Sequence, residues 1–181
     1  MPDFKLAPVP TPTESSLPLR HADFATLADA LDYAAQGETG ANFYAGSGKL
    51  AVVLPYRTLR QQALTLAQRL QSLSLERGAR VAVVAETNPD FLRFFFACQY
   101  AGLVPVALPA TVNLGGHDAY VGRLRGLLKG CGASVAVASS QFLRFLQEAA
   151  EGMDLVFVGS PAEFDALPEQ NAELQRSGPT E

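Results

Sequence analysis

Residues 76–109 constrain the fold most strongly, because two continuous apolar runs flank a capped helical segment. The runs, at residues 81–85 and 103–108, lack the alternation of a strand with one wet face, so they are typical of parallel strands covered on both sides. Between them, Asn88 can cap a helix, Pro89 suits its first position, and Gly102 can end it. This segment therefore predicts a strand–helix–strand unit.

The same alternation continues toward the C-terminus. Two further apolar runs, at residues 135–138 and 155–158, follow helical patterns, and Ser139 or Ser140 is placed to cap the second of these helices. Right-handed crossovers make such strands neighbours in one parallel sheet. Pro105 indicates an edge, a bulge or a strand end at its position. The predicted fold class is α/β, a parallel Rossmann-like sheet with helices on both faces.

Residues before position 76 predict an additional helix, a hairpin and an amphipathic helix. The helix follows a capping pattern at Thr26, the hairpin joins residues 41–44 to 50–54, and the amphipathic helix follows Pro55. We therefore expect a Pro-rich arm at residues 1–18, an α/β unit at 19–160, and a polar linker or tail at 161–181.

Composition excludes several classes of function. The net charge of −4 gives no basic footprint for nucleic acid. Cys98 and Cys131 lie in apolar helical patterns, which favours two core residues over a disulfide, and neither cysteine has a histidine at zinc-site spacing. With no signal-peptide pattern and no apolar run of about 20 residues, we expect a cytoplasmic protein without a membrane span.

Two motifs resemble catalytic elements but lack essential residues. The segment Gly46-Ser-Gly48-Lys49 resembles the end of a phosphate loop, yet Phe43 replaces the first glycine and Leu50 replaces the Ser or Thr, so a hairpin turn is favoured. His117 has no nucleophile beside it in sequence, and Glu148 lies on a polar helical face. We expect a surface role for His117 and solvation for Glu148.

One weak anion site remains a candidate. Gly115 and Gly116 lead into a helix that carries Arg123 and Arg125 within two turns. Free amides at a helix N-terminus attract anions, and arginines strengthen that attraction. The alternative, an ordinary loop with solvated arginines, is favoured by the sequence alone.

Five short motifs then follow one another in a distinctive order: Tyr56-Arg-Thr-Leu59, Gly78-Ala-Arg80-Val81-Ala82, Asn88-Pro89-Asp90-Phe91, Tyr100-Ala101-Gly102 and Val104-Pro-Val-Ala-Leu108-Pro109. The ordered set resembles the N-terminal subdomain of adenylate-forming enzymes, the acyl-CoA synthetases and fatty-acyl-AMP ligases. The phenylalanine-rich helix resembles the fatty-acyl-AMP ligase branch most. One departure is Pro55, where family members often carry Ser or Thr.

The resemblance implies a parent enzyme that activates a fatty acid with Mg-ATP. The acyl-adenylate then passes its acyl group to coenzyme A or to an acyl carrier protein. In the family, the phosphate loop and the catalytic Lys lie downstream of this region, so the resemblance implies no catalytic residue, metal ligand or cofactor in this chain. In relatives that use coenzyme A, a Gly-Gly loop lies near its phosphates, as Gly115 and Gly116 would here.

Three expectations about partners follow. The remainder of the ligase would pack on this subdomain, and the helix at residues 89–100, apolar nearly all round, would leave an exposed patch through which the isolated chain self-associates. A free-standing Rossmann-like module would instead bind a nucleotide or coenzyme A at loops 86–90, 109–117 and 138–140. An acyl carrier protein is disfavoured as a direct partner, because like charges repel.

Overall fold

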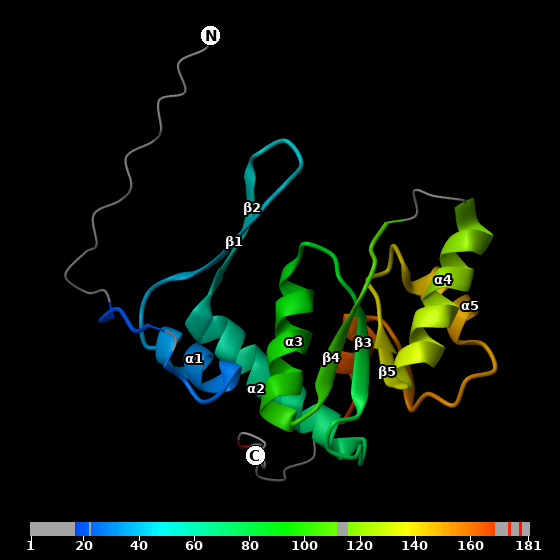
Figure 1. Ribbon diagram of the computed structural model, residues 1–181. Helices are drawn as coiled ribbons and strands as arrows, with labels where there is room; N and C mark the ends of the chain where they lie inside the picture. Colours follow the sequence, from blue (N-terminus) through cyan, green and yellow to red (C-terminus); the bar gives the residue numbers. More distant parts are fainter. Residues whose placement is uncertain (1–16, 22, 112–115, 169–173, 175–177, 179–181) are drawn as a thin grey trace.

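The computed structural model describes residues 17–21, 23–111, 116–168, 174 and 178, and Figure 1 shows how their helices and strands are arranged. In chain order, the elements are α1 Leu27–Ala34, β1 Gly40–Tyr44, β2 Leu50–Pro55, α2 Tyr56–Ser72, β3 Arg80–Val84, α3 Pro89–Ala101, β4 Val104–Leu108, α4 Gly116–Cys131, β5 Ala133–Val137, α5 Leu143–Ala150, β6 Phe157–Gly159 and α6 Pro161–Asp165. The order of helices and strands confirms the predicted α/β class, preceded by a helix and a hairpin.

Four parallel strands form the central sheet, in the order β4-β3-β5-β6. Successive side chains of β3 face opposite ways, so Val81 and Val83 enter one core while Ala82 and Val84 enter the other. The first core is formed with α1, α2, α3 and α6, and the second with α4 and α5. The prediction of helices on both faces is therefore confirmed.

Local sequence signals account for the helix boundaries in the first half of the chain. The Thr26 side chain accepts a hydrogen bond from the Asp29 amide at the start of α1. Asn88 accepts one from the Phe91 amide at the start of α3. Gly102 ends α3 in the left-handed conformation, with φ of 73°. Pro105 lies in β4, which is an edge strand, as the missing amide donor requires.

Helix α3 is covered more completely than its apolar sequence suggested. Phe94, Ala97 and Cys98 are fully buried, and Phe91 and Phe96 are partly buried against the first core. The large apolar side chains with the greatest exposure lie on other elements, four of them on the β1–β2 hairpin. The predicted exposed patch is therefore not found on α3.

The C-terminal third differs from the predictions in two places. Helix α5 begins at Leu143 after Phe142, without a side-chain cap, so the predicted cap by Ser139 or Ser140 is wrong. The Ser139 backbone carbonyl instead accepts hydrogen bonds from the Phe142 and Leu143 amides and forms a turn before the helix. The expected strand at residues 155–158 is shorter and begins at Phe157.

Residues 161–165, expected to begin a solvated tail, form helix α6. Ser160 and Glu163 form a reciprocal capping box at its start. Phe164 is fully buried, with its ring 5.3 Å from that of Phe94 and 4.9 Å from that of Phe157. A single buried aromatic residue thus anchors a segment whose overall composition is polar.

Both cysteines are free thiols, with Cys98 buried and Cys131 partly buried. Burial raises the pKa of the Cys98 thiol to about 12. Within the described ranges, no helix is both long enough and apolar enough to cross a membrane.

Candidate functional site

The carboxyl edge of the central sheet is where an α/β fold of this kind binds ligands. The chain runs from β3 outward to β4 and then crosses to β5 on the other side, so the switch point lies between β3 and β5. Loop residues meet at this edge, because the Ala85 amide donates to the Leu108 carbonyl at 2.8 Å and the Ala138 amide to the Gly159 carbonyl at 3.1 Å.

Three polar side chains at this edge are engaged or buried. Asn88 is engaged as the cap of α3, and the Tyr120 hydroxyl donates to the Pro109 carbonyl at 2.6 Å. Burial raises the pKa of Tyr120, and the negative charge of Glu86 raises it further. The Ser139 hydroxyl oxygen is buried without a hydrogen-bond partner in the described part of the chain. These groups do not form a nucleophile paired with a base.

The structure places two of the three residues of the candidate anion site. Gly116 is the first residue of α4, in the left-handed conformation with φ of 76°, and Arg123 is exposed on the same helix. Seven residues span about two turns, so the two lie on one face about 10 Å apart along the axis. Gly115 lies outside the described residues. Arg125 is engaged elsewhere, because it donates to the Glu148 backbone carbonyl at 2.6 Å.

Glu148 is paired with two side chains, contrary to the expectation that it is simply solvated. Its carboxylate contacts the His117 ring of α4 and accepts a hydrogen bond from Arg144 at 2.9 Å. The hydrogen bond from His117, followed by that from Arg144, lowers the pKa of Glu148. The His117 ring also lies 4.9 Å from the Phe145 ring.

His117 is partly exposed, in agreement with the predicted surface role, and its contacts hold the start of α4 against α5. The sequence contains the Arg144–Glu148 pair at helical spacing, but it gives no sign of the contact with His117, 31 residues away. The cluster therefore links α4 to α5.

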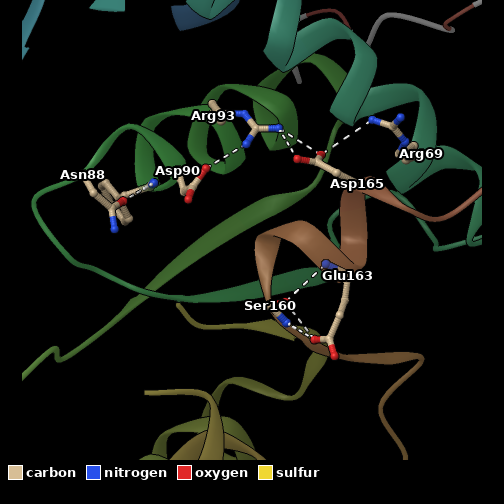
Figure 2. A network of polar contacts seen from close by, with 8 residues as sticks. Arg69, Asn88, Asp90, Arg93, Ser160, Glu163 and Asp165 are labelled. Atoms are coloured by element: carbon tan, nitrogen blue, oxygen red, sulfur yellow. Dashed lines mark hydrogen bonds and ion pairs between the residues drawn. The ribbon is translucent and has the colours of Figure 1, made fainter. Parts of the chain in front are cut away.

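A second charged cluster joins α6 to α2 and α3, as Figure 2 shows. The Arg93 guanidinium donates to both oxygens of Asp165, at 2.8 and 2.9 Å, and to Asp90 at 2.7 Å. Arg69 reaches the same Asp165 carboxylate at 3.6 Å. We call Arg69, Arg93 and Asp165 the α6 latch. The latch fastens α6, because its one carboxylate is shared by a guanidinium group from α2 and another from α3.

A cleft of about 700 Å³ lies at the opposite end of the sheet, beside the amino ends of β3 and β4. Its described lining comprises residues 25–27, 77–78, 99, 102–104 and 178, among which Arg77 is the one charged side chain. The Arg77 guanidinium donates a hydrogen bond to the Gly178 carbonyl at 2.8 Å, so this charged group already has a partner. The described lining residues include no Asp, Glu, His or Lys.

Two observations on the described residues bear on metal and phosphate binding. No group of three or more His, Cys, Asp or Glu side chains in the described ranges is arranged to hold a metal ion. Gly48 and Lys49 lie at the turn between β1 and β2, which form a sheet of their own apart from the central sheet. The hairpin-turn interpretation of residues 46–49 is thereby confirmed, and no phosphate loop is formed there.

Comparison with known proteins identifies the family. The sequence profile of the AMP-binding enzymes matches residues 33–179, most of the chain. The chain belongs to the AMP-binding enzyme family. The resemblance to adenylate-forming enzymes drawn from the five motifs is thus confirmed.

The similar proteins that have been named or solved agree with this assignment. A Caulobacter vibrioides protein named "Putative acyl-CoA synthetase" is 42% identical over 159 residues, which is 88% of this chain and 27% of that protein. A Mycolicibacterium smegmatis long-chain-fatty-acid–AMP ligase, FadD32, is 33% identical over 59% of this chain and 16% of its own length.

A solved structure from work on the fatty acyl-adenylate ligases of E. coli and L. pneumophila superposes with a TM-score of 0.83. It is 44% identical and covers 90% of this chain, which spans 29% of that structure. This AMP-binding chain therefore spans less than a third of the length of the relatives that it matches.

Proposed function

We propose that this chain is the N-terminal α/β subdomain of an ATP-dependent ligase that activates a fatty acid for transfer to a thiol. The observation that carries the proposal is the 42–44% identity, over about nine-tenths of this chain, to proteins described as an acyl-CoA synthetase and a fatty acyl-adenylate ligase. The chain alone is proposed to be inactive, because it spans less than a third of the length of those proteins.

In the proposed ligase reaction, a fatty-acid carboxylate oxygen attacks the α-phosphorus of ATP. The bond from that phosphorus to the pyrophosphate oxygen breaks, giving acyl-adenylate and pyrophosphate. A thiol, of coenzyme A or of a carrier protein's phosphopantetheine, then attacks the acyl carbon and releases AMP. The described residues of this chain take no part in either bond change. They form a packed wall whose sheet and helices support the remaining polypeptide.

Exchange of radioactive pyrophosphate into ATP tests the inactivity of the chain. The purified 181-residue chain is incubated with Mg-ATP and fatty acids of several chain lengths, with a full-length fatty acyl-adenylate ligase as the positive control. We expect no exchange above the protein-free blank. Exchange that requires both the fatty acid and the 181-residue chain would contradict the proposal.

The alternative function is a free-standing module that binds a nucleotide or coenzyme A. Gly116 and Arg123 on one face of α4 favour it, with Gly115 as the third proposed contact, because helix amides and a guanidinium suit a phosphate. Thermal-shift titration with ATP, AMP and coenzyme A discriminates between the two functions. The ligase proposal expects no shift, whereas a saturable shift lost in Arg123→Ala and kept in Lys129→Ala would favour the module.

The proposed ligase works in the cytoplasm, where ATP, coenzyme A and acyl carrier proteins occur. Its partners are small molecules and a thiol carrier, and the acidic charge of this chain argues against nucleic acid. The choice between the two acceptors is testable in the ligase itself, by offering coenzyme A and a holo carrier protein separately and measuring acyl transfer to each.

A further inference from the structure

A small polar hollow lies where the end of α1 meets the first two turns of α2, two helices that lie side by side in Figure 1. Its volume is about 370 Å³. We call it the α1–α2 hollow, and its described lining comprises Asp32, Ala35, Gln36, Arg57, Arg60 and Gln61. All of these side chains except that of alanine are charged or carry an amide, so the hollow suits a polar ligand.

The Arg60 side chain is oriented by contacts that begin in the core. Tyr100 of α3 is only 1% exposed, and its hydroxyl donates a hydrogen bond to Asp32 Oδ1 at 2.7 Å. The same carboxylate oxygen accepts a hydrogen bond from Arg60 Nε at 2.6 Å. Three helices therefore fix the direction of one guanidinium group, although 38% of the Arg60 side chain is exposed.

The Arg57 side chain is oriented by the end of α1. Its Nε donates a hydrogen bond to the Ala35 carbonyl at 3.4 Å, at the helix end that carries a partial negative charge. Residues three apart on a helix are neighbours on one face, so Arg57 and Arg60 lie on the same side of α2. The two guanidinium groups therefore belong to one surface of the molecule.

Both arginines retain unused hydrogen-bond donors. Within the described part of the chain, only the Nε atoms of Arg57 and Arg60 donate hydrogen bonds, and the terminal Nη atoms donate none. The lining carries two positive charges against the single negative charge of Asp32. Helix α2 has no side-chain cap and no acidic residue in its first turn, so its dipole adds positive potential. The hollow is therefore suited to an anion.

We propose that the α1–α2 hollow binds the phosphate group of a small soluble molecule. Guanidinium groups bind phosphate oxygens through paired N–H donors, and a phosphate monoester carries about −1.5 to −2 charges at pH 7. That charge opposes both Arg57 and Arg60, whereas a monocarboxylate opposes only one of them. Ligand sites range from about 300 to 1,000 Å³, so this hollow accepts a phosphate and the group next to it. The inference is independent of the proposed ligase function.

NMR spectroscopy of the nitrogen-15-labelled 181-residue chain tests the site. The Nε–H signals of Arg57 and Arg60 are followed as inorganic phosphate or glycerol 3-phosphate is added, with sodium chloride at equal ionic strength as the blank. We expect saturable shifts of both signals with either phosphate compound. Arg57→Gln should weaken the affinity about tenfold, because a charge-assisted hydrogen bond is lost. Arg80→Gln is the matched control, since Arg80 is an exposed arginine on β3 outside the hollow.

A second variant, Gln61→Glu, tests the same charge without altering either arginine. It adds a negative charge to the lining at an exposed position, so it should also weaken phosphate binding. Shifts that do not saturate, or that sodium chloride reproduces, would overturn the proposal. An affinity that neither Arg57→Gln nor Gln61→Glu lowers would overturn it as well. Binding to vesicles that contain phosphatidic acid, without binding to the soluble phosphates, would assign the hollow to a membrane lipid and contradict the proposal.

Discussion

The α6 latch gives the sharpest prediction about stability, through the substitution Asp165→Asn. Asparagine keeps the shape of the side chain and removes its charge, so Arg93 and Arg69 lose the carboxylate that they share. Both arginine side chains are largely buried, at 16% and 13% exposure, whereas Asp165 is 34% exposed. The cost therefore falls between that of a surface pair and that of a fully buried pair.

The magnitude follows from these exposures. Two opposite charges 4 Å apart attract by about 4 kcal/mol near a protein surface, before the cost of desolvation is subtracted. Exposed pairs contribute about 0–1 kcal/mol net, and breaking a buried pair costs about 3–5 kcal/mol. We expect Asp165→Asn to lower the free energy of unfolding by about 2 kcal/mol, which lowers Tm by about 4–8 °C in a domain of this size.

Urea denaturation followed by circular dichroism measures this change. Asp154→Asn is the control, because Asp154 is exposed and lies in the loop before β6. A double-mutant cycle with Arg93→Gln should give a coupling free energy of about 1–2 kcal/mol. A loss below about 0.5 kcal/mol for Asp165→Asn, no larger than that of the control, would refute the reasoning that the latch fastens α6.

Four further predictions concern the core, the thiols, acid stability and association. Phe164→Ala should cost about 3–5 kcal/mol, as urea midpoints will show. In the native chain a thiol reagent should modify Cys131 and reach Cys98 only after unfolding, because burial raises the Cys98 pKa to about 12. The hydrogen bonds from Ser160 lower the pKa of Glu163 below its ordinary value of 4.5. The free energy by which the native chain is more stable than Glu163→Ala should therefore be full at pH 7 and be lost as the pH falls below 4.5, as urea titrations will show. The isolated chain should self-associate weakly at high concentration through the hairpin, and a strictly monomeric species in sedimentation would count against this.

The central sheet was predictable from the sequence because its signals are local and strong. Continuous apolar runs at β3 and β5 indicate strands covered on both faces, and Asn88, Pro89 and Gly102 mark the ends of α3. Pro105 indicated an edge, a bulge or a strand end, and β4 is an edge strand. These features depend on residues close together in the chain, so their pattern carries the information.

The missed features depend on long-range contacts. Helix α6 is held by Phe164 against Phe94 and by Asp165 against Arg93, across about seventy residues of chain. The polar composition of this segment gave no sign of these contacts, so the sequence predicted a solvated tail. The periodicity of apolar residues likewise could not predict that α3 is covered or that the hairpin is exposed, because both depend on which elements pack nearby.

For the candidate site, the sequence predicted which edge of the sheet would carry the loops. The strand order places the carboxyl ends of β4, β3 and β5 side by side at that edge. The buried hydroxyl of Ser139 had no signal in the sequence. The pairing of Glu148 with His117 had none either, because it arises from the way α4 and α5 meet. The role of Gly115, Gly116 and Arg123 as an anion site stays a prediction.

Reading the open reading frame past the codon for Glu181 tests the central claim most directly. The claim is that this AMP-binding chain supplies a packed subdomain while the chemistry belongs to a longer polypeptide. The account predicts that the frame continues, with a loop rich in Ser, Thr and Gly followed by a Lys soon after residue 181. A stop codon directly after Glu181 would contradict the account and would make the nucleotide-binding or coenzyme A-binding module the first function to test.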